Sequence, residues 1–459
     1  MRKIFLSILM TSILIIPVAA QQGPLNLEQC VSMALRSNLR IETANERLEE
    51  MDAAIDEMST ANMPKLSANA AYTMLFPKPQ VLTMDLANYL PALIGSLMAN
   101  PPVAPPALGM DTMYAGMHRV SVGLTATHVI YTGGKIKNAQ KITEHSRTAA
   151  EWQKKSAVRE IRRDVTKAYY QALAANKGVV ALDSAIALME VMLRDLGNAV
   201  EVGMRGEHEL LQAQVQLANQ KLARQQAATG AQMAHDYLAT LIGVPVSTPV
   251  TLVNDLHAPE SFSVLPLPVL QTRARDASTD LKALEEQQKI IETSLLITGN
   301  SLMKPTVLAQ ASYSGGAGTH GDIPGSGNWK NSGMASLIAQ WDIYDFGATN
   351  QKRRQTLSQK RQLDLTMENI RVNLDMLVKN NCASLQDAFA SIETGKKSIE
   401  QTKRSYEISY DKFQEGMMLS SEVLNAQNMI LQAEISYYAA LSNFYARQAD
   451  LDYLVNDEK

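Results

Sequence analysis

Two patterns of apolar and polar residues alternate along this chain of 459 residues. Long stretches repeat apolar residues every three or four positions, as in a helix that buries one face, whereas shorter stretches alternate them one by one, as in a strand. The alternating stretches are 64–74, 119–131, 305–313 and 333–344, and long helical stretches follow at 135–202 and 348–415. A helix over 135–202 would be roughly 100 Å long, which predicts a coiled-coil element rather than an ordinary globular helix.

The order of these elements occurs twice, which indicates an internal duplication. The first half, 21–243, runs helix, strand, loop, strand, long helix and a further helix at 207–242. The second half, 269–459, repeats that order and ends with a helix at 420–455. The stretch between them, 244–268, contains five prolines and is predicted to be a linker.

In each half, a turn joins the last two helices, and at this turn the two halves match best. Residues 203–214 and 416–427 align at an offset of 213, and six of their twelve positions are identical. Each segment begins with glycine, Gly203 or Gly416, which readily adopts the positive φ of a tight turn. Each segment is therefore predicted to form the tip of a helical hairpin.

The N-terminus has the features of an export signal. Arg2 and Lys3 precede an apolar run that ends in small residues at Ala20, so we expect a signal peptide over 1–20. The alternative is an N-terminal anchor helix, although the run is short for one. No later stretch has the length and apolar character of a membrane-spanning helix, so such a chain would cross a membrane as strands. The two cysteines are too few for a disulfide scaffold, and a net charge of −3 gives no support for a nucleic-acid partner.

The four predicted strands cannot close a barrel by themselves. Their length of about ten residues suits tilted transmembrane strands, but the smallest single-chain barrels have about eight strands. An open sheet edge in lipid would leave backbone groups unpaired, whereas three chains would supply twelve strands and the long helices would extend the tube. The aperiodic, proline-rich stretch 73–117 is predicted to be a long loop, with one short helix near 89–98, that caps or folds into the outer mouth.

Four features of the chain carry a resemblance to a known family: the opening segment, the proline before the first strand of each half, the Tyr-x-x-Gly after the second strand, and the two tips. In that order they are Leu25 to Gln29 with Ala34, Leu35 and Asn38; Pro64 and Pro305; Tyr131 and Tyr344; and 203–214 and 416–427. With these features in this order, the chain resembles the TolC family of outer membrane efflux proteins over almost its whole mature length.

The resemblance implies a fold class, a function and partners. The fold class is an α+β membrane protein with duplicated long helical coiled-coil hairpins, whose homotrimer forms a twelve-stranded β-barrel and an α-helical periplasmic tunnel. The implied function is a passive exit duct in the outer membrane, for a tripartite efflux pump or type I secretion, gated at the helical tips. The implied partners are outer-membrane lipid, a periplasmic adaptor and, through it, an inner-membrane transporter.

The resemblance also implies a periplasmic gate at the tips. The family's acidic positions correspond to Glu209 and Glu422, which in a trimer would place six carboxylates around one axis and favour cations. The alternative is a solvated coiled-coil face. The chain departs from the family where Met418 replaces an arginine and Asn425 an acidic residue, so that a latch would use Arg205. Phe413 stands where a constriction tyrosine is common.

Two further groups of residues receive roles through the resemblance. The adaptor-contact candidates lie in the turns and are Gly203, Met204, Gly416, Met417 and Met418. The candidates for an aromatic belt at the membrane interface are Tyr72, Tyr131, Tyr313, Trp341 and Tyr344. Packing inside the protein is the alternative for Tyr313 and Tyr344.

Enzyme functions find no support in the sequence. Its seven histidines are scattered, and zinc-protease, phosphate-binding and nucleophile-elbow motifs are absent. We therefore predict no catalytic residue, no metal site and no cofactor. The alternatives to the duct are a soluble periplasmic coiled-coil scaffold or adaptor, with its strands packed inside a globule, and an exported hydrolase, which lacks a candidate site.

Overall fold

The computed structural model describes residues 23–74, 80–84, 110–114, 118–246, 248–253, 256–300, 304–318 and 328–456, with the single positions Tyr89, Ile94 and Ser96. The predicted signal peptide lies outside these residues, as does most of the helix predicted near 89–98. The chain divides into two compact units, 1–51 with 145–288 and 361–459, and 52–144 with 289–360. Both sequence repeats contribute to both units, so the repeats are not separate domains.

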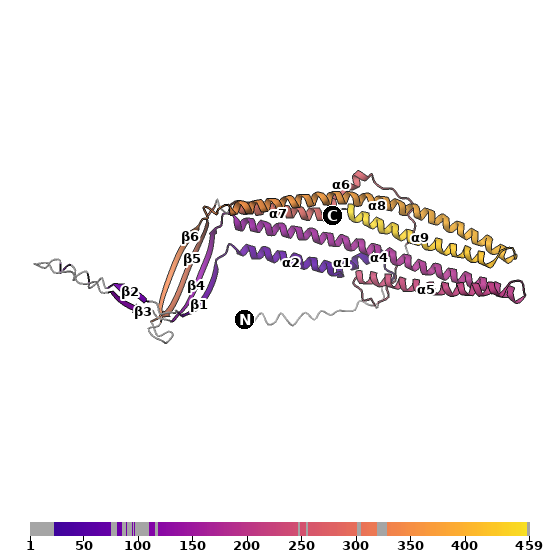
Figure 1. Cartoon of the computed structure of the whole chain (residues 1–459), viewed down its shortest axis with the longest axis horizontal. Helices are drawn as coiled ribbons and strands as arrows, with labels where there is room; N and C mark the ends of the chain where they lie inside the picture. Colours follow the sequence, from indigo (N-terminus) through magenta and orange to yellow (C-terminus); the bar gives the residue numbers. More distant parts are fainter. Residues whose placement is uncertain are drawn as a thin grey trace. The chain divides into compact units, whose positions relative to one another are not determined.

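Four long helices form two hairpins (Figure 1). Hairpin 1 consists of α4 (Lys135–Glu201) and α5 (Glu207–Leu241), and hairpin 2 of α8 (Ala348–Gln414) and α9 (Ser420–Val455). Both α4 and α8 contain 67 residues. The shorter helices are α1 (Leu27–Ser37), α2 (Leu39–Thr60), α6 (Leu267–Ala277) and α7 (Thr279–Asn300).

Apolar clusters stabilise the helical unit. The largest packs α1, α4, α5, α8 and α9 around Tyr169, which is fully buried and donates a hydrogen bond of 2.9 Å to the Val253 carbonyl oxygen. A second cluster lies next to the hairpin tips and takes residues from all four long helices, among them Met192, Ala213, Phe413 and Val423. Each large side chain buried in this way contributes roughly 1.5–3 kcal/mol, so the second cluster holds the two hairpins together near their tips.

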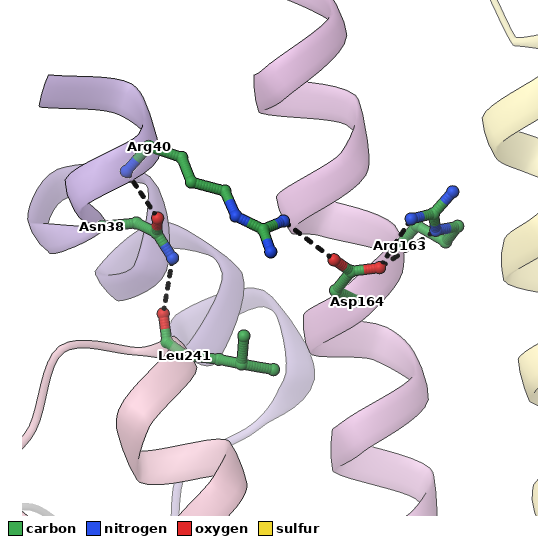
Figure 2. A network of polar contacts seen from close by, with 5 residues as sticks. All are labelled: Asn38, Arg40, Arg163, Asp164 and Leu241. Atoms are coloured by element: carbon green, nitrogen blue, oxygen red, sulfur yellow. Dashed lines mark hydrogen bonds and ion pairs between the residues drawn. The ribbon is translucent and has the colours of Figure 1, made fainter. Parts of the chain in front are cut away.

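The N-terminal helical pattern is interrupted at Asn38. Asn26 begins α1 with a capping box, as its position predicts, but ψ is 126° at Asn38 and α2 starts after it. The Asn38 side chain accepts a 3.0 Å hydrogen bond from the Arg40 backbone N–H and donates one of 3.3 Å to the Leu241 carbonyl oxygen at the end of α5. Arg40 then reaches Asp164 of α4, as Figure 2 shows. Asn38 therefore caps both helices and ties them to hairpin 1.

The second unit contains a four-stranded antiparallel sheet in the order β1-β4-β5-β6. The strands are β1 (Lys65–Met74), β4 (His118–Tyr131), β5 (Thr306–Gly318) and β6 (Lys330–Gln340). Each repeat supplies one pair of strands, and β4 pairs with β5 to join the two repeats into one sheet. The sheet leaves one edge of β1 and one edge of β6 unpaired among the described strands, which is the arrangement that closure with other chains requires.

The strands differ from their predicted bounds in the second repeat. We expected 305–313 to be the strand and the glycine-rich residues after it to be a loop, but β5 continues to Gly318. The reason is close packing rather than a turn, because a Cβ atom at Gly316 would lie 2.8 Å from the Val120 carbonyl oxygen. At the other end, β6 stops at Gln340 instead of 344, since its partner strand begins at Thr306, directly after Pro305, which has no N–H.

The stretch 73–117 also differs from a simple loop. It contains a second antiparallel pair, β2 (Gln80–Met84) with β3 (Met110–Tyr114), in which Leu82 pairs with Thr112. Both strands lie outside the proline cluster at 101–106, whose composition had suggested an aperiodic loop.

Among the described helices, none combines the length and the hydropathy needed to cross a membrane.

Candidate functional site at the hairpin tips

The two tips have the same backbone geometry. Gly203 and Gly416 each have φ of 75°, the positive value that their sequence position predicts. The N–H of Met204 donates to the Ala199 carbonyl oxygen at 2.8 Å, and that of Met417 to the Lys412 carbonyl oxygen at 2.9 Å. The N–H groups of Gly203 and Gly416 also donate, to the carbonyl oxygens of Val200 and Phe413. The two bonds at each tip form the Schellman pattern that ends a helix. The duplicated motif therefore encodes a duplicated turn.

The side-chain contacts at the two tips differ. Arg205 of hairpin 1 reaches across to hairpin 2, where its Nη2 donates to the carbonyl oxygens of Met418 at 2.9 Å and Phe413 at 3.3 Å. Its guanidinium also lies 4.9 Å from the centre of the Phe413 ring. Because Met418 stands at the equivalent position of hairpin 2, hairpin 2 offers no reciprocal contact of this kind. Beside the apolar cluster, Arg205 therefore provides a polar link between the two turns, and its side chain is only 13% exposed.

The two acidic candidates have different surroundings. Glu209 Oε2 lies 3.7 Å from Arg205 Nη1 and receives no hydrogen bond from the described residues. Glu422, its equivalent, is exposed and has no ion pair with any residue that the structure describes. In this conformation, Glu209 is partly neutralised by the arginine of its own hairpin and Glu422 is not. Asn425 is also exposed.

A row of three aromatic rings on α8 ends at the ring that Arg205 contacts. The rings of Tyr406 and Tyr410 stack with centres 5.7 Å apart, and Phe413 follows 6.4 Å further on. Phe413 is 5% exposed and belongs to the core between the hairpins, where its ring contacts the Arg205 guanidinium.

Two polar contacts across the hairpins were not foreseen from the sequence. Tyr410 Oη donates a hydrogen bond to Asp195 Oδ2 of α4, and burial, followed by this carboxylate, raises the pKa of Tyr410 to about 12. Gln427 is 1% exposed, and its Nε2 donates to the Ala185 carbonyl oxygen at 2.6 Å. Gln427 belongs to the repeated motif, but its equivalent Gln214 is exposed, so the repeat alone gives no sign of this role.

The tips also present apolar side chains to solvent. Met204 and Met417 are 74% and 68% exposed, and Val202 and Leu419 beside them are exposed as well. Met418 is half-buried against the core and contributes its carbonyl oxygen to the arginine contact. The thioethers and aliphatic groups make each tip an apolar surface.

The aromatic candidates for the membrane interface lie at different levels of the sheet. Tyr131 ends β4, and Trp341 and Tyr344 are exposed just beyond β6. Tyr72 lies near the opposite end, where its hydroxyl is 2.8 Å from His118 Nδ1. Tyr313 pairs with Leu124 and Gly333 in mid-strand, because β5 is longer than predicted. Its placement near a strand end was therefore wrong.

A duplicated subunit of helical hairpins, with a sheet of four antiparallel strands that is open at both edges, defines the class of outer-membrane channel subunits. The family model of the outer membrane efflux proteins matches residues 30–244 and 271–457. The chain belongs to this family. No curated protein matched the chain.

Solved structures show the same fold. The outer-membrane channel OprN has a TM-score of 0.72 at 16% identity, over 94% of this chain and 90% of that one. The outer membrane protein VceC from Vibrio cholerae has a TM-score of 0.69 at 15% identity, over 94% and 97%. The open state of the MtrE outer membrane channel from Neisseria gonorrhoeae has a TM-score of 0.68 at 16% identity, over 94% and 91%.

These comparisons confirm the predicted class. The chain has the fold of the outer-membrane efflux channels, in which the strands of three chains form the barrel and the hairpins form the tunnel. It is an outer-membrane efflux duct, and its family is one of channels rather than enzymes. The soluble periplasmic scaffold is not favoured.

Proposed function

We propose that this duct is gated at the hairpin tips and that Arg205 is its latch. The observation that carries the proposal is the pair of hydrogen bonds from Arg205 to the Met418 and Phe413 carbonyl oxygens, which join the tip of hairpin 1 to that of hairpin 2. Opening the tunnel at this end requires the tips to separate, and their separation breaks both bonds.

The strength of the latch suits a gate. A hydrogen bond from a charged donor contributes about 1.5–3 kcal/mol, and a cation–π contact about 0.5–2 kcal/mol. Together these contacts amount to several kcal/mol, and about 5.5 kcal/mol is enough to move a two-state equilibrium from 1:99 to 99:1. A docking partner that competes for the tips could therefore open the duct by contact energy alone, without covalent chemistry.

We further propose that the docking partner is a periplasmic adaptor, which links the duct to an inner-membrane transporter. Its contact surface would be the apolar tip made by Met204 and Met417 with the two turn glycines. Flexible thioether side chains adapt to varied apolar partners, and their exposure at both tips supports this role. The substrate then passes through the duct passively, and the transporter supplies the energy.

Replacing the latch residue tests this function. In Arg205→Met, which copies the residue of hairpin 2, the two hydrogen bonds and the ring contact are lost. We expect larger single-channel conductance in a planar bilayer, because the closed state loses its link. The control is Arg404→Met, since Arg404 is an exposed arginine of α8 that pairs only locally, with Glu407 at 2.9 Å. Equal conductance for wild type and Arg205→Met would refute the latch.

A further inference from the structure

A second surface of interest lies where the strands join the helices. The sheet register pairs Lys65 with Thr127, Tyr131 with Val307 and Thr306 with Gln340. The four strand ends that lead into α2, α4, α7 and α8 therefore fall at one end of the sheet (Figure 1). We call this end the junction.

Beyond β6, the junction exposes a run of large apolar side chains. They are Trp341, Ile343, Tyr344 and Phe346, and Phe346 is 91% exposed. Phe346 also has φ of 52°, a left-handed conformation that is costly for a residue other than glycine. Among the described residues that are not glycine, it alone has a positive φ. An apolar ring exposed to water and a left-handed backbone each cost free energy.

The turn that holds Phe346 is fixed by hydrogen bonds. The Asp345 carboxylate accepts bonds from the N–H of Gly347 at 3.1 Å and from that of Thr349 at 2.7 Å, and so caps α8. A hydrogen bond from the Thr349 side chain, followed by these backbone bonds, holds the pKa of Asp345 below its usual range. The rings of Tyr344 and Phe346 meet edge to face with centres 4.9 Å apart. These contacts fix the turn in the conformation that leaves the apolar run exposed.

Basic side chains lie in the first turns of the two helices that begin at the junction, α8 and α4. Lys352, Arg353 and Arg354 are exposed in the first two turns of α8 and form no ion pair within the described part of the chain. Lys137 and Lys141 of α4 are exposed in the same way. The strand ends at the junction, their connections to the helices and the adjoining two turns of each helix contain eight basic residues and four acidic ones: Lys65, Lys135, Lys137, Lys141, Lys304, Lys352, Arg353 and Arg354, and Asp56, Glu57, Asp342 and Asp345.

We propose that the junction binds the headgroups of anionic phospholipids in the periplasmic leaflet of the outer membrane. Aromatic side chains favour the boundary between acyl chains and headgroups, and lysine and arginine extend their stems along apolar surface to place the charge on a phosphate. The exposed run from Trp341 to Phe346 enters the boundary, and Lys352, Arg353 and Arg354 contact the phosphates. This inference rests on the placement of the duct in the outer membrane, but not on the latch.

The test measures stabilisation by lipid. Purified full-length protein in neutral detergent is heated with phosphatidylglycerol, phosphatidylcholine or inorganic phosphate, and the apparent affinity is taken from the shift in the unfolding midpoint. We expect phosphatidylglycerol to stabilise the wild type more than the other two. In the combined variant Lys352→Gln, Arg353→Gln and Arg354→Gln, its apparent affinity should fall roughly 100-fold, because each basic residue at an anionic surface is worth roughly fivefold.

The matched control is the pair Lys396→Gln and Lys397→Gln, two exposed lysines further along α8, which should leave the affinity unchanged. An equal response of the triple variant and the wild type, or equal stabilisation by inorganic phosphate, would overturn the proposal. A separate variant, Phe346→Ser, tests whether a second copy covers the apolar run. Loss of the trimer in lipid-free detergent would identify that contact and overturn the lipid assignment. Conductance of the triple variant should match the wild type, so the result is independent of the latch.

Discussion

Arg205 and Met418 occupy the same position of the two repeats, yet only the arginine can donate hydrogen bonds to the other tip. This difference of one side chain decides which hairpin holds the other, and it leaves Glu209 beside a positive charge while Glu422 faces solvent. At the residue scale, the duplication provides two identical turns, and the departures from identity provide the cross-hairpin contact that we propose as the latch.

The hydroxyl of Tyr410 gives a prediction at this scale. Its pKa is raised to about 12 by burial first and by Asp195 second. The hydrogen bond is therefore fully present below the ordinary tyrosine pKa of about 10, and its contribution is lost as the pH rises through about 12.

Tyr410→Phe should lower the free energy of unfolding at pH 7 by about 1 kcal/mol, a low value for a bond to a charged group because the pair is partly exposed. The difference from wild type should be smaller at pH 11 and should vanish only above about pH 12, where wild-type Tyr410 is ionised. Thermal unfolding at pH 7 and pH 11 measures this difference in stability. The control is Tyr237→Phe, at an exposed position of α5. A Tyr410→Phe difference that is the same at both pH values would contradict the assignment.

The sequence allowed some of these residues to be predicted and not others. The turn glycines, the two acidic positions and Arg205 could be located because the repeat aligns them. Tyr410, Asp195 and Gln427 could not, because their partners are backbone or side-chain atoms more than 200 positions away in the chain. The contact between the buried Phe413 ring and Arg205 could not be predicted either, because it joins residues 208 positions apart.

At the scale of elements, long and strongly periodic segments were predictable and short breaks were not. The bounds of α4, α5, α8 and α9 lie within one residue of the helical stretches in the sequence. The break at Asn38 depends on a hydrogen bond to the end of α5, and the length of β5 depends on how closely β4 approaches Gly316. Both are tertiary effects that no local pattern contains.

The helix-ending turns give a prediction at this scale. Gly416→Ala should destabilise the protein by about 1 kcal/mol or more, because alanine at φ of 75° is strained although the space around it is open. Gly178→Ala, in the middle of α4 and also in open space, should instead stabilise it by up to about 1 kcal/mol. Unfolding midpoints of the two variants separate backbone strain from the added methyl group, and destabilisation by both would contradict the turn assignment.

At the scale of the whole molecule, three chains bring three pairs of tips around one axis. In the proposed gate, three Glu209 carboxylates would lie beside arginines, whereas three exposed Glu422 carboxylates would act on ions in the tunnel. Rings of carboxylates favour cations in narrow pores. Cation preference should therefore depend mainly on Glu422, even though the two residues are equivalent by sequence.

The measurement that tests this account most directly is the reversal potential of the reconstituted duct in a salt gradient. Glu422→Gln should lower the cation-to-anion permeability ratio strongly, and Glu209→Gln only slightly, because Arg205 already offsets the Glu209 charge. Glu260→Gln, at an exposed position far from the tips in the sequence, serves as the control. A reversal potential of Glu422→Gln equal to that of the wild type would contradict a gate formed by the hairpin tips.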